Sequence, residues 1–253
     1  MSIELEVSDY IAVVRLDKPP VNALDRATRR RLIEIFDEVS ERADVRVAIL
    51  TGTGKFFCSG ADLKDRPDAG KAGDFLDHNR WTRETGNAIR ECSKPVIAAV
   101  NGPALGAGFG LMAACDIFLA SEDATFAMPE INVGLAGGVS MLRTLFGRSF
   151  TRRMFFTGMK VPAAELYRRG VLDEMVPGDQ LMPLAMEIAQ EIASKAPLAV
   201  AYAKQAANMM DLMPQRDGYR FEQNITMALA RTEDAQEARK AFLEKRKPVY
   251  QGR

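Results

Sequence analysis

Apolar and polar positions at the start of the chain predict short elements in the order of an α/β protein. Residues 3–7 and 11–16 have the pattern of two strands joined by a Ser-Asp-Tyr turn. Residues 28–43 place apolar side chains at the i, i+3, i+4, i+7 spacing of an amphipathic helix. The compact apolar run at 45–50 predicts the next strand, so the order is strand, helix, strand.

The middle of the chain continues in this order. Residues 64–74 are polar and rich in glycine, which is typical of a mobile loop, and a charged helix is expected at 75–91. The apolar run at 95–100 predicts a buried strand. The small residues of 104–115 predict a buried helix, and another strand is expected at 116–120.

From Arg148 onward the pattern is helical, with prolines 197 and 214 near expected helix starts. The expected helices span residues 148–157, 162–169, 179–195, 198–212, 216–231 and 233–246. We therefore predict an α/β core over 1–195 and a helical C-terminal segment over 196–253.

Composition narrows the class of protein. Lys plus Arg equals Asp plus Glu, at 34 each, so no overall positive field favours nucleic acid. Three cysteines without a CxxC pair indicate buried thiols in a reducing compartment and no metal site. The N-terminus lacks the basic and apolar regions of a signal peptide and is no membrane span, so we expect a cytoplasmic protein.

Two glycine-containing segments share a design that can bind an oxygen. Phe56–Leu63 and Asn101–Leu111 each leave an expected strand and enter a turn or helix start. Backbone N–H groups at such places have no partner inside a helix. The amides of Ala61 and Ala107 could thus converge on one carbonyl as an oxyanion hole. The alternative is that the small residues only allow tight helix packing.

Other glycine-loop motifs fit poorly. The pairs Gly52/Gly54 and Gly106/Gly108 each lack the third glycine of a dinucleotide fingerprint, and no GxxxxGK[ST] loop occurs. Ser59 lacks the preceding glycine of a nucleophile elbow. A nicotinamide enzyme or a serine hydrolase is therefore disfavoured.

Glu130 is the candidate acid/base. It follows a proline within an apolar stretch, so its carboxylate is expected in a low-dielectric site where burial raises its pKa. The alternative is a first-turn glutamate that interacts with a helix dipole.

The ordered motifs GAD, NGPALGAG, CDI, ATFAMPE and AFLEKRKP resemble the enoyl-CoA hydratase/isomerase (crotonase) superfamily over nearly the whole chain. The resemblance implies a spiral of ββα units whose helical C-terminal segment assembles trimers, often stacked as hexamers. It assigns the oxyanion-hole amides to Ala61 and Ala107 and one catalytic glutamate to Glu130. It implies an acyl-CoA substrate, with no metal and no cofactor apart from the CoA of that substrate.

One position departs from the two-glutamate hydratases of this family. Their second glutamate falls on Gly110, which has no side chain. A single base is enough for double-bond isomerisation, whereas hydration usually uses a second group that orients water. The pattern therefore favours isomerisation or an atypical hydratase. Candidate stand-ins for the second acid are Asp62, Asp65, Asp68 and His78, although the favoured interpretation of each is a solvated loop or helix residue.

The resemblance also implies a CoA channel. It assigns the adenine and pantetheine contacts to two segments, 21–24 and 61–64, and adds phosphate contacts and two residues that reach CoA from a neighbouring subunit. The channel residues are Val21, Ala23, Leu24, Asp62, Leu63 and Lys64; the phosphate contacts are Lys18 and Lys64; the neighbouring-subunit residues are Phe242 and Lys245. The run EKRK could instead be a basic helix end.

Two alternatives to an enoyl-CoA hydratase/isomerase stay open at this point. Gly110 is compatible with an acyl-CoA-binding protein that has lost catalysis. Another reaction of the family, such as dehalogenation, decarboxylation or thioester hydrolysis, is also open. Dehalogenation would need a carboxylate nucleophile over the ring, and the sequence identifies none.

Overall fold

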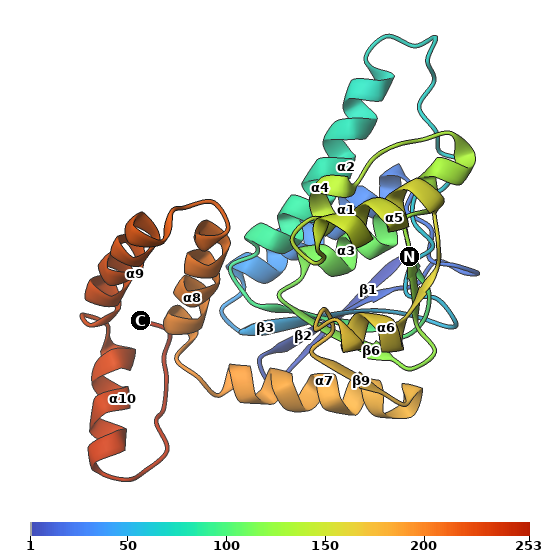
Figure 1. Cartoon of the computed structure of the whole chain (residues 1–253). Coiled ribbons are helices and arrows are strands. Elements are labelled where there is room, and N and C mark those ends of the chain that lie inside the picture. Colours follow the sequence, from blue (N-terminus) through green and yellow to red (C-terminus); the bar gives the residue numbers. More distant parts are fainter. Residues whose placement is uncertain (1) are drawn as a thin grey trace.

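The computed structural model describes residues 2–253, and its centre is a six-stranded sheet with the order β1-β2-β3-β4-β6-β9 (Figure 1). Its strands are β1 (Ile3–Ser8), β2 (Ile11–Leu16), β3 (Val47–Gly52), β4 (Val96–Val100), β6 (Ile117–Ser121) and β9 (Glu174–Val176). The β1–β2 pair is antiparallel, as expected for two strands joined by a two-residue turn, and every other pair is parallel. Parallel strands need helical crossovers, which supply the covering layers.

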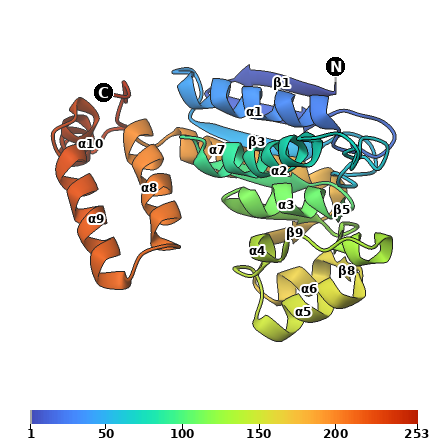
Figure 2. The same cartoon turned by 90° about the horizontal axis from the view of Figure 1, so that it is seen from above.

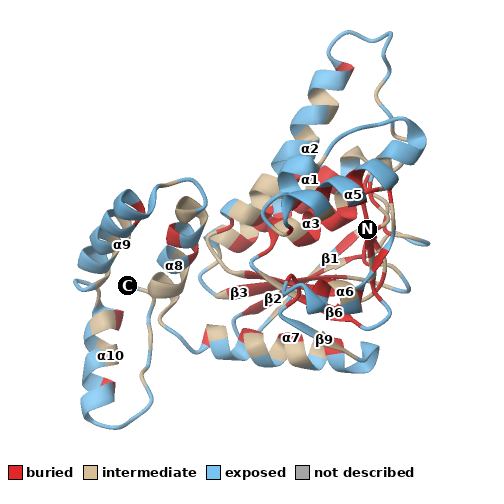
Figure 3. Cartoon of the chain, viewed as in Figure 1, coloured by how far each residue is buried: buried red, intermediate tan, exposed pale blue. Residues whose placement is uncertain are grey.

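Helices cover both faces of this sheet (Figure 1). On one face lie α1 (Arg26–Glu41), α2 (Asp74–Glu91) and α3 (Ala107–Ala114), and on the other lies α7 (Gly178–Ala193). The two apolar layers form separate clusters on either side of the strands, because successive strand residues point to opposite faces. Figure 3 shows that the buried residues gather in the strands and on the inner sides of these helices.

A second, three-stranded sheet lies beyond α3. It consists of β5 (Ala104–Leu105), β7 (Thr125–Ala127) and β8 (Val161–Pro162), in that order. Short helices fill the rest of this region: the 3₁₀ helix η1 (Pro129–Val133), α4 (Val139–Leu142), α5 (Arg148–Thr157) and α6 (Ala163–Arg168).

The helices α8 (Pro197–Met210), α9 (Gln215–Leu229) and α10 (Glu233–Leu243) stand beside the α/β unit in both views (Figures 1 and 2). Lys204 on α8 joins them to the sheet. Its ammonium group lies 2.8 Å from the Asp116 carboxylate and donates to the carbonyls of Ile89 and Lys94, both at 3.1 Å.

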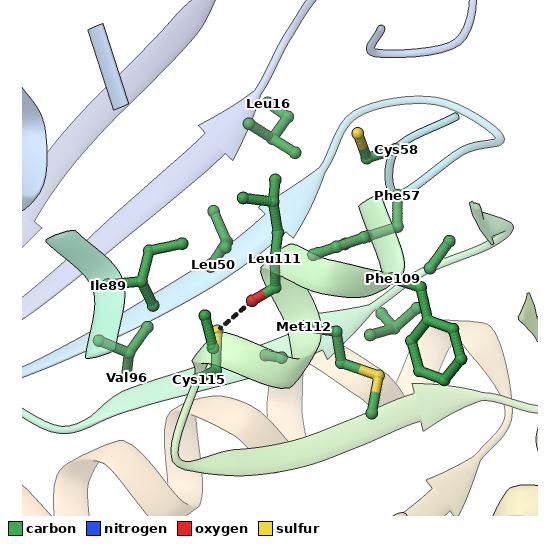
Figure 4. Close-up of a cluster of buried hydrophobic side chains, with 14 of the residues drawn as sticks. Leu16, Leu50, Phe57, Cys58, Ile89, Val96, Phe109, Leu111, Met112 and Cys115 are labelled. Carbon is green, nitrogen blue, oxygen red and sulfur yellow. Dashed lines mark hydrogen bonds between the residues drawn. The ribbon is translucent and has the colours of Figure 1, made fainter. Parts of the chain in front are cut away.

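All three cysteines carry free, buried thiols, as the sequence predicts. Cys115 lies in the cluster between the sheet and α3, where its Sγ donates to the Leu111 carbonyl oxygen at 3.3 Å (Figure 4). Burial raises the pKa of Cys58 to about 12. The Cys58 thiol therefore stays protonated at neutral pH.

Most predicted elements are present within two residues of their expected ends. The helix predicted at 104–115 is wrong at its start, because Ala104 and Leu105 pair with β7 and Gly106 then turns with φ +53°. The C-terminal part is not helical throughout, since β8 and β9 interrupt it. The polar stretch at 64–74 forms turns without a helix or strand up to Asp74, where α2 begins.

No helix formed by residues 2–253 has both the length and the apolar character needed to span a bilayer.

Candidate active site

A pocket of about 490 Å³ opens between α1, α2, α3 and the loop that follows η1. It brings together residues from segments that are far apart in the sequence. The predicted site residues on its wall are Leu24, Ala61, Asp62, Leu63, Asp65, His78, Ala107 and Glu130.

The Ala61 amide is left free by the way its segment pairs. Residues 24 and 61 form an isolated parallel bridge, in which the Leu24 amide donates to the Gly60 carbonyl and the Asp62 amide donates to the Leu24 carbonyl. The Gly60 carbonyl and the Asp62 amide are thus hydrogen-bonded to Leu24, whereas the N–H of Ala61 points away from Leu24. Within residues 2–253 this amide has no acceptor.

The Ala107 amide is free for a different reason. Ala107 is the first residue of α3, and the first amides of a helix have no carbonyl before them. A Cβ atom added at Gly60 would lie 3.4 Å from the Ala107 nitrogen, so the two loops touch. Gly60 adopts φ +96°, which favours glycine and allows this approach. Two unpaired amides on one pocket wall can donate to a single oxygen.

Glu130 lies in the first turn of η1, with its carboxylate against the backbone of Gly106. A Cβ atom added at Gly106 would collide with Glu130 Oε1 and would lie 3.4 Å from Cδ. Oε2 is enclosed, and no hydrogen-bond partner for it exists in the described part of the chain. Burial raises the pKa of Glu130 above its ordinary value, as the sequence predicts. The raised pKa moves this carboxyl towards the range in which a general acid/base exchanges protons.

Met141 of α4 occupies the space beside Gly110. A Cβ atom added at Gly110 would lie 2.5 Å from Met141 Cε and 3.2 Å from its Sδ. Met141 also lines the pocket and approaches Gly86 of α2. The place where a longer side chain at position 110 would project is thus filled by an apolar group.

The four stand-ins for a second acid differ in their surroundings. Asp62 is ion-paired with Lys18 at 3.2 Å, and Asp65 accepts from the backbone and lies 3.6 Å from the guanidinium of Arg26. Asp68 is exposed and does not line the pocket. His78 does line it, with a buried Nδ1 that lacks a partner among residues 2–253. His78 is therefore the stand-in with an unused polar atom.

The two segments expected to contact CoA run side by side. The Ser59 amide donates to the Val21 carbonyl at 3.0 Å, and the Leu24 amide donates to the Gly60 carbonyl at 2.8 Å. Asn22, with φ +54°, fixes this arrangement through its side-chain amide, which donates to the carbonyls of Thr53 and Phe56. Val21 and Ala23 are half-buried beside the pocket residue Leu24.

The expected cations are placed unequally. Lys18 lies between Asp25 at 2.6 Å and Asp62 at 3.2 Å, so two carboxylates already neutralise it. Lys64 is exposed at the rim beside Leu63. Phe242 lies in the last turn of α10 and Lys245 follows that helix; neither lines the pocket, and Phe242 is 83% exposed. Their action from a neighbouring subunit stays a prediction.

The rim of the pocket is tied down by Arg26, at the start of α1. Its guanidinium donates two hydrogen bonds to Asp74, at 3.0 and 2.8 Å, and lies 3.9 Å from Asp77. Because it also contacts Asp65, one side chain joins the start of α1 to both ends of the 64–74 stretch.

Arg29 and Met141 are among the pocket residues that sequence reasoning missed. Arg29 is only 2% exposed although it is charged. Its position, three before the buried Leu32 on the apolar face of the helix, was the available signal. No sequence signal could reveal Met141, because its role depends on a contact with α3.

Among residues 2–253, no group of three or more histidine, cysteine or acidic side chains is arranged to bind a metal ion.

Comparisons with known proteins agree with this architecture. The family model described as Enoyl-CoA hydratase/isomerase matches residues 6–253. A carnitinyl-CoA dehydratase from Salmonella enteritidis is 38% identical over all of this chain and 99% of its own length, and one from Salmonella typhimurium is equally similar.

Solved structures agree as well. An enoyl-CoA hydratase from Bacillus anthracis superposes with a TM-score of 0.93 at 34% identity, with both chains fully covered. DspI from Pseudomonas aeruginosa superposes with a TM-score of 0.94 at 29% identity, covering 99% of this chain and 97% of its own. The predicted crotonase-like α/β fold is confirmed, and the chain belongs to the enoyl-CoA hydratase/isomerase family of enzymes.

Proposed function

We propose that the pocket binds an acyl-CoA thioester and stabilises its enolate, with Glu130 as the acid/base. The observation that supports the proposal is that one pocket is lined by two residues with unpaired amides, Ala61 and Ala107, and by a carboxyl group held against Gly106. A thioester oxygen between the two amides gains charge when a proton leaves Cα, and preorganised donors stabilise that charge.

Glu130 and the two amides account for the proton and the electron pair that move in each reaction. Glu130 removes a proton from Cα, and the electron pair of the C–H bond moves onto the thioester oxygen as an enolate. Return of the proton to Cγ of a conjugated enolate shifts the double bond. In dehydration the enolate electron pair forms the Cα=Cβ bond as the Cβ–O bond breaks. The proton held by Glu130 passes to the departing hydroxide, which leaves as water, and the reverse sequence adds water.

Gly110 and Met141 bear on the choice between these outcomes. Isomerisation needs one base only, and Glu130 supplies it. Hydration or dehydration needs a group that holds water, and the apolar Met141 side chain fills the place beside Gly110. Of the four stand-ins for a second acid, His78 is the one that lines the pocket with an enclosed, unpartnered polar atom. The carnitinyl-CoA dehydratase and enoyl-CoA hydratase relatives support water addition or elimination.

The test compares hydration of crotonyl-CoA with isomerisation of a 3-enoyl-CoA. We expect Glu130→Gln to lower kcat by about 10²–10⁴-fold in whichever reaction the wild type catalyses. The exposed Glu187→Gln on α7 is the matched control and should leave the rate unchanged.

A second candidate function is an acyl-CoA-binding protein without catalysis, and Gly110 is its motivation. Calorimetric binding of butanoyl-CoA by a wild-type protein that turns over neither thioester would support it against the enzyme. Full activity in Glu130→Gln would reject the assigned acid/base.

We also propose that α8–α10 mediate assembly into a homotrimer or hexamer. These helices expose large apolar side chains on the outside of the chain: Tyr219, Met227, Phe242 and Leu243. Such surfaces are typical of contacts between subunits. Light scattering on the purified chain gives the subunit number, and a monomer at micromolar concentration would contradict the proposal.

A further inference from the structure

Arg29 is a buried cation without a counter-charge. It is 2% exposed on the inner side of α1, and it lines the pocket. Within the described chain it makes neither a hydrogen bond through its guanidinium nor an ion pair. Arg29 is not among the residues whose side-chain nitrogens are both fully enclosed and unpartnered. Its small exposed surface therefore includes the guanidinium.

The nearby carboxylates do not form ion pairs with Arg29. Asp65 and Asp25 influence it only from beyond ion-pair distance. Asp65 is bound by Arg26, and Asp25 is bound by Lys18 at 2.6 Å while it caps α1 through the Thr28 amide at 2.8 Å. Both acids are therefore already neutralised by other groups.

An arginine in this position cannot remove its own charge. A buried carboxylic acid or lysine can become neutral, but the guanidinium stays protonated throughout the working pH range. The desolvation of an unpaired buried charge costs several kcal/mol in general. We therefore expect a fold to retain such a charge where a ligand offsets this cost. The pocket is the accessible space next to this guanidinium, and the missing anion belongs there.

His78 adds a second polar atom to the same wall. Its Nδ1 is buried and unpartnered, and Arg29 is among the charges that act on it. Arg29 comes from α1, His78 from α2 and Glu130 from η1, and all three line the same pocket. An acyl chain whose thioester sits near Glu130 would direct its far end away from the two amides.

We propose that Arg29, assisted by His78, binds an anionic group at the distal end of the acyl chain, so that the preferred substrates are CoA thioesters of dicarboxylic acids. This inference rests on the proposed function of the pocket. A planar carboxylate matches the fork of the guanidinium, and charge-assisted pairs of this type are the strong ones. An acyl group with a cationic end would instead be repelled by a fixed positive charge.

The same anion chemistry is present in the phosphates of CoA. Those groups are large and strongly hydrated, and the exposed Lys64 at the rim suits them. Arg29 lines the pocket of about 490 Å³ and is only 2% exposed, which leaves no room for a bulky hydrated phosphate. We therefore assign it to the acyl chain, and the experiment separates the two sources.

The experiment measures calorimetric Kd values for hexanoyl-CoA, adipoyl-CoA and free CoA with the full chain. Adipoyl-CoA should bind about 10- to 100-fold more tightly than hexanoyl-CoA, which has the same length without the carboxylate. Arg29→Met should abolish this preference, and Arg29→Lys should retain part of it. Arg31→Met on the same helix, where the side chain is 40% exposed and does not line the pocket, is the control and should keep the whole preference.

Two results would overturn the inference. The first is equal affinity of the wild type for adipoyl-CoA and hexanoyl-CoA, which needs no variant and so does not depend on folding. The second is an equal loss of affinity for all three ligands in Arg29→Met, which would assign Arg29 to the CoA phosphates. Preferential adipoyl-CoA binding without any enoyl turnover would reject the proposed function alone, whereas turnover without the preference would reject this inference alone.

Discussion

Two basic side chains are buried almost completely, and the molecule treats them in opposite ways. Lys204, between α8 and the sheet, has a carboxylate and two carbonyls within 3.1 Å. Arg29, between α1 and the pocket, has no such partner in the described chain. The first cation is saturated because its role is structural. The second keeps its donors unused, which is typical of groups that await a ligand.

Glu130 extends this comparison to an acid. Glu130 is half-buried and also has an enclosed, unpartnered oxygen, but it can take up a proton and become neutral. The pocket therefore holds one charge that can be switched off and one that cannot. Proton transfer requires the first kind, and recognition of an anion requires the second.

The largest effect is expected where the saturated cation is removed. Lys204→Met leaves Asp116 with a single amide donor, from Val96, and strips two carbonyls of their partner. We expect a loss of about 3 kcal/mol in the free energy of unfolding, measured by urea titration. The exposed Lys195→Met is the control and should change it by less than about 0.5 kcal/mol.

The next effect concerns the placement of Glu130. Gly106→Ala adds a methyl group where Glu130 Oε1 lies, at a residue with φ +53°. We expect kcat to fall by about 100-fold, because the carboxyl must move away from Cα. Gly147→Ala has no atom within 4 Å of the added Cβ and should leave kcat unchanged. Unaltered activity in Gly106→Ala would show that the Glu130 position is not critical.

A smaller effect of opposite sign is expected at Arg29. Arg29→Met removes an unpaired buried charge, so the free energy of unfolding without ligand should stay level or rise by about 1 kcal/mol. Parallel urea titrations of Arg29→Met and Lys204→Met check this. A loss as large as that of Lys204→Met would mean that Arg29 is structural.

The smallest effect is the pH dependence of stability. Because burial raises the pKa of Glu130 in the folded state, the native protein holds this proton more tightly than the unfolded chain does. The stability from this group is fully present below its ordinary pKa of 4.5 and is lost as the pH rises through the folded pKa. In urea titrations, the free energy of unfolding of the wild type should therefore decrease from about pH 5 to about pH 8. The decrease should be smaller in Glu130→Gln. The exposed Glu187→Gln should decline like wild type.

Activity should follow the same proton. The isomerisation direction needs the carboxylate, so kcat/KM should rise with pH to the folded pKa of Glu130 and then level off. A profile that is flat from about pH 4.5 upward would contradict the assigned base.

Local patterns predicted much of the fold, because helix and strand periods are set by each segment alone. The helix over 148–157 and the strand over 11–16 have the bounds that the sequence predicts. The start of α3 was misplaced because Ala104 and Leu105 become a strand only by pairing with β7, which lies twenty residues further on. Such pairing is a tertiary effect that composition does not encode.

The candidate site shows the same division. The burial of Glu130 and its raised pKa followed from the apolar residues around it in the chain. Arg29 was missed because helix periodicity counts apolar positions, and a charge on that face looks like a break in the pattern. Whether such a charge is paired depends on Asp25, Asp65 and helix α2. Their positions around Arg29 are visible only in the structure.

The Arg26 contacts at the rim have a consequence for kinetics. Arg26 holds the pKa of Asp74 far below its usual range, so Asp74 stays ionised throughout the pH span of an ordinary enzyme assay. The Arg26–Asp74 ion pair at the entrance therefore keeps its charges over the pH range of such an assay. A pH–rate profile of this enzyme should report its acid/base residue without a superimposed gating transition. Changes in ionic strength, which weaken partly exposed ion pairs, are the condition that would act on the entrance instead.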